Sequence, residues 1–241
     1  MRQLFHERNT EHGGPYLVRP FQQFETLDPR RNELIHALSP HGRAALEEAG
    51  TFSKFAPVAT GPFKHQLMVS CVTASIALQA GKLEFRYIAQ HELLDRAQTE
   101  LRIRVDGDLR PDAFFALEMQ GKYIALFVEA DRGTEPLATD SARKSWQRTI
   151  RQYRRLVGDD LYREVFRLKA PAVMLNITVS ERRLDAMMKV LRGEFPNGCP
   201  YILNLALPEF GRVLRPPKLL DLLDGEWARA GHPTYRIATV N

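Results

Sequence analysis

The sequence predicts an α/β fold in which helices cover the faces of a mixed sheet. From residue 63 onward, helical and strand-like segments follow one another in the order helix, strands, helix, strand, helix, strand. The composition, with 44% hydrophobic and 26% charged residues, is that of a globular chain with a sizeable core. The length of 241 residues suits one large domain with a smaller appendage.

The first fifty residues have a different pattern from the rest. Residues 32–50, NELIHALSPHGRAALEEAG, predict a strand, a turn and a helix that begins at Ser39 and ends before Gly50. Residues 51–62 are rich in Thr, Ser, Gly and Pro, which is typical of a linker. We therefore divide the chain into an N-terminal segment at 1–50, a linker at 51–62 and an α/β domain at 63–241.

Within the α/β domain, the spacing of apolar residues assigns each element in turn. Helices are expected at 63–81, 141–156 and 180–195, and a short one around Trp227. Strands are expected at 82–89, 99–105, 112–119, 122–129, 170–179 and 201–207. The first helix carries His65 on its apolar stripe, and Ser180 is the expected start of the helix at 180–195.

Composition also narrows the classes of protein to consider. The two cysteines, Cys71 and Cys199, are far apart and form no C-x-x-C pair, so neither a disulfide scaffold nor a zinc site is indicated. We find no apolar run long enough to span a membrane and no signal-peptide pattern, and we expect a cytoplasmic protein without a membrane partner. The net charge of +5 suits a polyanionic partner such as DNA.

The two longest strands form a predicted hairpin whose register can be read directly. Gln120-Gly121 is a suitable two-residue loop, because glycine readily supplies the positive φ that such turns need. Met119 then pairs with Lys122, and the same register sets Asp112 opposite Glu129. Facing residues have Cβ atoms about 4.5–5.5 Å apart, so the two carboxylates would lie close together.

Asp131 points to the same face of its strand as Glu129, so three acids gather at one end of the sheet. Like charges at this distance are unfavourable unless a cation or a shared proton relieves them. A hard cation such as Mg²⁺ or Mn²⁺ prefers such oxygen ligands. The alternative is that these acids are simply solvated, or that a longer loop moves Asp112 and Glu129 out of register.

Three motifs follow the helix that bears His65: LRPDAFF at 109–115, YIALFVEADRGTEP at 123–136 and QY at 152–153. Together they resemble the replication-relaxation family of bacterial plasmid and mobile-element proteins. The second half of such proteins is similar to the PD-(D/E)XK nuclease-like fold, a mixed sheet flanked by helices. SPHGRAAL at 39–46 resembles the end of a winged helix. Since the earlier helices of that domain are not seen, we expect a winged-helix remnant.

The resemblance implies a role for each acid. Asp112 matches the first acid of the nuclease motif and Glu129 the second, and His65 is implied beside them as a catalytic residue. The motif's lysine is replaced by Asp131, an acid that this family shares. A lysine that the family carries four residues before a tyrosine is replaced by Thr149, before Tyr153. Asp112, Glu129 and Asp131 are thus the implied ligands of Mg²⁺ or Mn²⁺.

The helix at 141–156 has two opposite stripes. Trp146, Ile150, Tyr153 and Val157 are spaced to pack on the sheet, with Thr149 beside them and able to face the site. A second stripe, on the outer face, consists of Lys144, Arg148, Arg151 and Arg155. It is either a solvated helix face or a surface that contacts DNA phosphates.

Two residues near the acids each have two alternative roles. Arg132 directly follows Asp131 and is expected to hold one of the acids through a charge-assisted hydrogen bond, with phosphate binding as the alternative. His65 is either a core residue or a neighbour of the acidic site.

These observations favour a DNA-binding accessory or regulatory protein of plasmid or mobile-element replication or mobilisation. Its nuclease-like domain would be degenerate, and replication or mobilisation proteins would be further partners. One alternative is a Mg²⁺-dependent endonuclease or nickase that uses Asp112 and Glu129. Another is a module for protein interaction. The sequence leaves open whether the chain is an enzyme and what its oligomeric state is.

Overall fold

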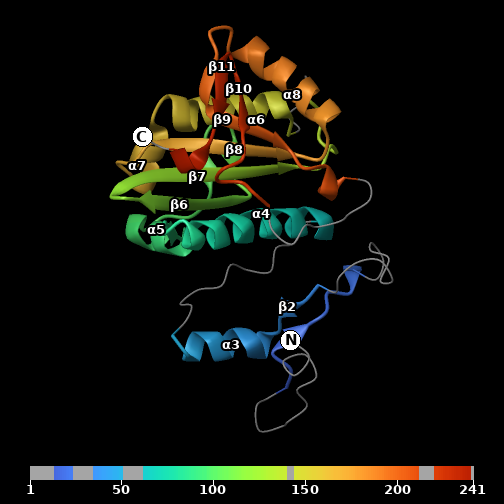
Figure 1. Cartoon of the computed structure of the whole chain (residues 1–241), viewed down its shortest axis with the longest axis vertical. Coiled ribbons are helices and arrows are strands. Elements are labelled where there is room, and N and C mark those ends of the chain that lie inside the picture. The colour runs from blue at the N-terminus through green and yellow to red at the C-terminus, as the bar shows by residue number, and fades with distance from the viewer. Residues whose placement is uncertain (1–13, 24–34, 51–61, 140–143, 212–219, 240–241) are drawn as a thin grey trace. The chain divides into compact units, whose positions relative to one another are not determined.

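The computed structural model describes residues 14–23, 35–50, 62–139, 144–211 and 220–239. The chain divides into two compact units, residues 1–66 and residues 67–241 (Figure 1). The predicted linker at 51–62 lies outside the described residues apart from Pro62. The domain boundaries therefore stay a prediction.

In the first unit, β1 (Leu17–Val18) pairs antiparallel with β2 (Ala37–Leu38), and α3 (Pro40–Glu48) follows. Ser39 begins this helix as predicted, because its Oγ accepts a hydrogen bond of 2.9 Å from the Gly42 amide. Gly50, with φ of +67°, ends it in the left-handed region that favours glycine. Whether these elements belong to a winged helix stays a prediction.

The second unit is built on a seven-stranded sheet with the order β11-β10-β9-β8-β7-β6-β3. The strands are β3 (Arg86–Ile88), β6 (Ala113–Met119), β7 (Lys122–Asp131), β8 (Ala172–Thr178), β9 (Cys199–Ala206), β10 (Trp227–Ala230) and β11 (His232–Tyr235). Strands β7, β8 and β9 run parallel, and the other neighbours are antiparallel. The predicted mixed α/β sheet is confirmed.

Helices flank this sheet. They are α4 (Phe63–Lys82), α5 (Gln90–Ala97), α6 (Trp146–Tyr153), α7 (Leu161–Phe166) and α8 (Glu181–Glu194). Short turns are η2 (Arg154–Gly158), η3 (Pro208–Phe210) and η4 (Ile237–Thr239), and β4 (Ile103–Arg104) with β5 (Asp108–Leu109) forms a small second sheet. Figure 1 shows α4 along one face of the large sheet and α6 and α8 on the other.

The β6–β7 hairpin has the predicted register. Gln120 and Gly121 both have positive φ, of 52° and 81°, as a tight two-residue turn requires. Met119 pairs with Lys122, and the ladder continues regularly to Ala113 opposite Val128. Because both strands are buried on both faces beyond the exposed turn end, the hairpin belongs to the core and fixes the position of the residues that follow Val128.

Some predicted elements are wrong or shorter than expected. The strand expected at 82–89 is limited to Arg86–Ile88, because α4 continues to Lys82 and Glu84 takes a positive φ of 57°. Helix α5 was not expected. The helix expected around Trp227 is the hairpin β10–β11, which turns at Gly231 with φ of +69°.

Within the described part of the chain, no helix is both long and apolar enough to cross a membrane.

Candidate functional site

A small pocket lies at the carboxyl ends of β7 and β8, where the first turn of α6 meets the sheet. The polar side chains that line it are those of Glu129, Asp131, Glu135, Lys144, Thr149 and Asn176, and the larger apolar ones are Trp146 and Met187. The space open to water is about 20 Å³, which is enough for roughly one water molecule or ion. The acids of the EADRGTEP segment thus border a defined site.

Glu129 is the buried acid of this pocket, with a residue exposure of 5%. Its Oε1 accepts a hydrogen bond of 2.9 Å from the Tyr153 hydroxyl, and its Oε2 lies 3.6 Å from Lys144 Nζ. Burial raises the pKa of Glu129, the negative charge of Asp112 raises it further, and Lys144 and Tyr153 oppose the shift; the result is a pKa of about 8. Glu129 therefore carries a proton for much of the time at neutral pH.

Asp112 lies next to Glu129 but does not face it as predicted. The regular ladder ends at Ala113 and Val128, and the Asp112 amide donates to the Val128 carbonyl at 2.9 Å, one position out of register. The Asp112 carboxylate accepts a hydrogen bond of 2.8 Å from the Ala130 amide. The two acids interact through their charges, as predicted, but Asp112 lies beyond the end of the regular ladder.

Asp131 is held by neighbours on β8 and α8. Its Oδ2 accepts hydrogen bonds from Thr178 Oγ1 at 2.8 Å and from Arg183 Nε at 2.9 Å, and its Oδ1 accepts one from Arg183 Nη2 at 3.1 Å. Arg183 also donates to the Glu135 carbonyl at 2.6 Å. This bidentate pairing uses the oxygens that a metal would need.

The expectation that Arg132 holds an acid is not met. Its Nη1 donates to the Phe210 carbonyl at 2.6 Å, and Arg183, an arginine from a distant helix, holds Asp131 instead. Partial burial lowers the pKa of Arg132. The reason is local geometry: β7 continues to Asp131, so the next side chain points away from the acids.

Lys144 lies in the pocket, whereas the helical stripe placed it on the outer face. The helix begins at Trp146, because Ser145 is the N-cap and its Oγ accepts from the Arg148 amide. Lys144 precedes the helix and does not follow its periodicity. Its Nζ lies 3.2 Å from Glu135 Oε1 as well as 3.6 Å from Glu129. Burial lowers the pKa of Lys144, but the nearby acids outweigh burial and the pKa is raised overall.

The other three cations of the predicted stripe contact neighbouring parts of the protein. Arg148 donates to the Asp106 carbonyl at 2.8 Å, Arg151 pairs with Glu194 at 2.9 Å, and Arg155 pairs with Asp159 at 3.3 Å. The side chains of Arg151 and Arg155 remain more than half exposed. Their contact with DNA stays a prediction.

Two buried oxygens in the pocket have no hydrogen-bond partner in the described structure. They are Thr149 Oγ1 and Asn176 Oδ1, on side chains that are 2% and 1% exposed. Asn176 Nδ2 donates to Asn204 Oδ1 at 2.9 Å. Buried polar atoms are nearly always hydrogen-bonded, so two orphaned oxygens in one pocket make it suited to a polar ligand such as water or an ion.

His65 is half-buried and falls in the first unit, so its role beside the acids stays a prediction. Across the described ranges, no three His, Cys, Asp or Glu side chains are grouped so that they could hold a metal ion. The metal-binding role of Asp112, Glu129 and Asp131 likewise stays a prediction, and Asp131 is the member of this set that fits a metal least.

The family model described as replication-relaxation matches residues 12–166, more than half of the chain. The chain belongs to the replication-relaxation family. Neither the curated proteins nor the solved structures contain a match. Membership of the replication-relaxation family indicates a role in the replication or mobilisation of plasmids or other mobile elements. The matched region includes the acids, Lys144 and Tyr153, but it ends before Asn176 and Arg183.

Sequence reasoning missed Asn176 and Arg183 of the site in this replication-relaxation protein and placed Lys144 on the wrong face. The position of Lys144 was readable from Ser145, a good N-cap residue directly before the apolar stripe. Asn176 was readable as a polar residue within the apolar strand VMLNIT. Arg183 left no local signal, because its partner Asp131 is 52 residues away in the sequence.

Proposed function

We propose that this chain is a DNA-binding accessory or regulatory protein of plasmid or mobile-element replication or mobilisation, with a degenerate nuclease-like domain. The observation that carries this proposal is a group of cations at one end of the sheet. Arg110 precedes β6, Arg132 follows β7, Lys144 precedes α6, and Arg182 and Arg183 open α8. Because β6 is antiparallel to β7 and begins where β7 and β8 end, all five residues lie at the same end of the sheet.

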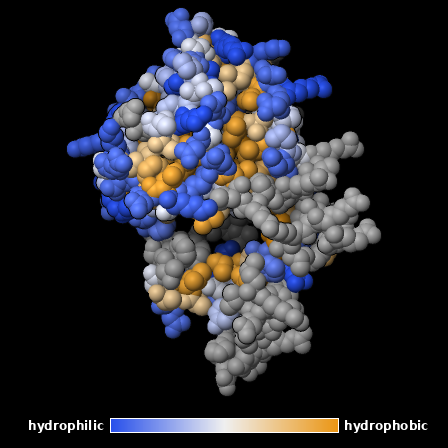
Figure 2. Space-filling view, viewed as in Figure 1, coloured by the Kyte–Doolittle hydropathy of each residue, from blue (hydrophilic) through white to orange (hydrophobic). Residues whose placement is uncertain are grey.

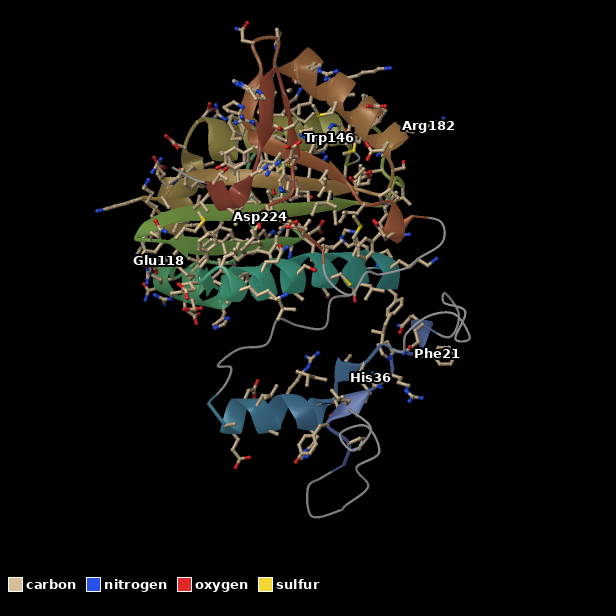
Figure 3. All side chains as sticks on the ribbon, viewed as in Figure 1. Phe21, His36, Glu118, Trp146, Arg182 and Asp224 are labelled. Carbon is tan, nitrogen blue, oxygen red and sulfur yellow. The ribbon has the colours of Figure 1, made fainter. Side chains whose placement is uncertain are left out.

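Two of these cations are suited to phosphate contacts. Arg110 and Arg182 are exposed, and within the described parts of the chain neither has an ion pair or a hydrogen bond from its side chain. Figure 3 shows Arg182 projecting from α8 into solvent. Hydrophilic residues also cover much of the visible face of the larger unit (Figure 2). With the net charge of +5, these features support a polyanionic partner.

Two features of the pocket support a degenerate nuclease site. Asp131 takes the position of the motif's lysine, and it is fully engaged by Arg183 and Thr178. Glu129 has a raised pKa, because of burial and the charge of Asp112, and so it is a weak anion at neutral pH. Asp131 and Glu129 therefore contribute to the folded structure at least as much as to any catalytic reaction.

The test is DNA binding as a function of salt, on the wild type and on Arg110→Gln and Arg182→Gln. Each lost phosphate contact reduces the salt slope by about 1. Lys122→Gln, an exposed cation at the opposite, hairpin end of the sheet, is the matched control and keeps the full slope. Wild-type binding that is absent even at low salt contradicts the proposal and favours a protein-interaction module.

A second candidate function is a metal-dependent endonuclease, favoured by the position of Lys144. Asp131 replaces the lysine of the nuclease motif, and Lys144 places an ammonium group beside Glu129 in its stead. In such an enzyme Asp112 and Glu129 would hold Mg²⁺ or Mn²⁺, and the bound cation would supply an activated water. Lys144 would orient the acid that it pairs with. Plasmid nicking in Mg²⁺ or Mn²⁺, lost in Glu129→Gln, tests this; no nicking by the wild type removes the candidate.

A further inference from the structure

We propose that the pocket is a binding site for a hard divalent cation, formed by the Glu129 carboxylate, the Thr149 hydroxyl and the Asn176 amide oxygen. Lys144 Nζ, 3.6 Å from Glu129, is the cation that already lies beside this site. The proposal assigns roles to Thr149 and Asn176 that the predicted set of three carboxylates does not contain. It is independent of whether the chain binds DNA.

The first argument is the pair of orphaned oxygens. Thr149 Oγ1 and Asn176 Oδ1 are both buried without a partner, and both residues line the pocket beside Glu129. Such an atom loses its hydration and gains nothing in return, which is unfavourable unless a ligand is bound there. One orphan is unremarkable in a protein of this size, but two in a single small pocket point to one shared ligand.

The second argument is that the orientation of the Asn176 amide is determined by its neighbour. Asn204 Nδ2 donates to the carbonyls of Ile202 and Ala228, at 3.1 and 3.4 Å. Its Oδ1 is therefore the acceptor for Asn176, whose Nδ2 donates at 2.9 Å. Exchanging the N and O of Asn176 would place two acceptors together, and exchanging those of Asn204 would place two donors together. Asn176 must then leave its oxygen, an acceptor, unpaired in the pocket.

The third argument concerns the chemistry of the ligand. Carboxylate, hydroxyl and amide oxygens are hard ligands that suit Mg²⁺ and Mn²⁺ rather than softer metals. Mg²⁺ commonly takes one or two carboxylates and keeps several waters. The space of about 20 Å³ admits one ion, and the half-exposed Lys144 side chain borders the pocket where waters would complete the coordination.

The fourth argument is that the pocket already attracts a cation. Lys144 Nζ lies 3.6 Å from Glu129 and 3.2 Å from Glu135. Its side chain is 52% exposed, so it can leave toward solvent without unpacking the core. A divalent cation at Glu129 displaces the ammonium through charge repulsion. Metal binding therefore changes the charge on the surface beside the pocket, because the released Lys144 ammonium can pair with another anion.

The test is calorimetric titration of the full chain with MgCl₂ and MnCl₂, with thermal unfolding of the same samples. We expect one site with a dissociation constant in the range of about 0.1–1 mM. Thr149→Val and Asn176→Leu each weaken binding about tenfold or more, whereas Thr149→Ser, which keeps the hydroxyl, retains it. Thr73→Val is the matched control, since the Thr73 hydroxyl bonds to its own helix at Val69. Glu129→Gln abolishes binding.

Thermal unfolding of each variant in EDTA shows whether it is folded. If Asn176→Leu does not fold, the comparison of metal affinity between Thr149→Val and Thr149→Ser tests the proposal. The proposal is overturned if the wild type shows neither binding heat nor a metal-dependent rise in Tm, since the pocket then holds water alone. It is equally overturned if Asp112→Asn abolishes binding and Thr149→Val leaves it intact. That result assigns the metal to the carboxylates predicted from sequence.

Discussion

Two ion pairs at opposite ends of the β6–β7 hairpin have the same separation and different surroundings. Arg86 and Glu118, near the turn, lie 3.6 Å apart, and Lys144 and Glu129, at the pocket, also lie 3.6 Å apart. The Glu118 side chain is 25% exposed and that of Glu129 is 7% exposed. Burial of Glu129 is the main cause of its raised pKa. Distance alone therefore does not set the strength of an ion pair; the loss of hydration does.

The largest expected effect is a pH dependence of stability that comes from the pocket end. The pKa of Glu129 is raised from 4.5 to about 8, so the folded state binds the extra proton between these values and the unfolded state does not. The free energy of unfolding in EDTA is then expected to fall, by several kcal/mol, as the pH rises through this window. Urea unfolding at a series of pH values measures it. Glu129→Gln should flatten the profile, and Glu118→Gln should leave it unchanged.

The next effect concerns the buried pair Asp131–Arg183. Their side chains are only 8% and 17% exposed, so Asp131→Asn leaves a guanidinium without its charged partner. We expect the free energy of unfolding to drop by about 3 kcal/mol. Arg86→Gln, at the exposed pair near the turn, should change it by less than about 1 kcal/mol. Equal losses in the two variants would contradict the view that burial distinguishes the two ends.

A smaller effect is expected on the pKa of Glu129 itself. Lys144→Met removes a nearby positive charge and should raise this pKa further, whereas Asp112→Asn removes a negative charge and should lower it. A change of about one unit corresponds to about 1.4 kcal/mol. Titration of the side-chain carboxyl carbon by NMR reads both shifts. Shifts of the same sign in the two variants would rule out these charges as the cause.

The smallest effect is expected from Thr149→Val in EDTA. Since the hydroxyl is buried without a partner, its removal should leave the metal-free protein equally stable or stabilise it by about 1 kcal/mol. Thr73→Val, which removes a bonded hydroxyl, provides the comparison. Chemical unfolding of the two variants gives the difference. A clear loss of stability in Thr149→Val would show that the hydroxyl has a partner, such as a tightly bound water.

Local sequence signals predicted the parts of this structure that depend on near neighbours. Gln120-Gly121 determined the hairpin register, and Ser39 and Ser180 marked helix starts, because turns and caps are made by residues close in the chain. The site was predicted less completely. Glu129 was placed at the end of the sheet correctly, but the regular ladder stops at Ala113, and no residue in the sequence indicates that the Asp112 amide bonds to the Val128 carbonyl instead.

The wrong position of Lys144 has a simple physical reason. Helical periodicity was extended back to residue 141, although Ser145, which is itself extended, caps a helix that begins at Trp146. Arg132 was expected to bind an acid because it is adjacent in sequence, whereas Arg183 reaches Asp131 through the packing of α8 beside β8. Interactions between distant elements depend on the whole fold, and a single sequence contains little information about them.

The parallel pairing of β7 with β8 limits what can be removed from this protein. The family match ends at residue 166, before β8 begins, yet β8 pairs with β7 from Ala125 to Asp131. A fragment cut at the end of the match would turn the ten-residue β7, of which seven residues are buried in the intact chain, into an open apolar edge. Such edges recruit strands from other molecules. Expression of the matched region alone should therefore yield aggregates, and the region shared by the family is not by itself a unit of folding.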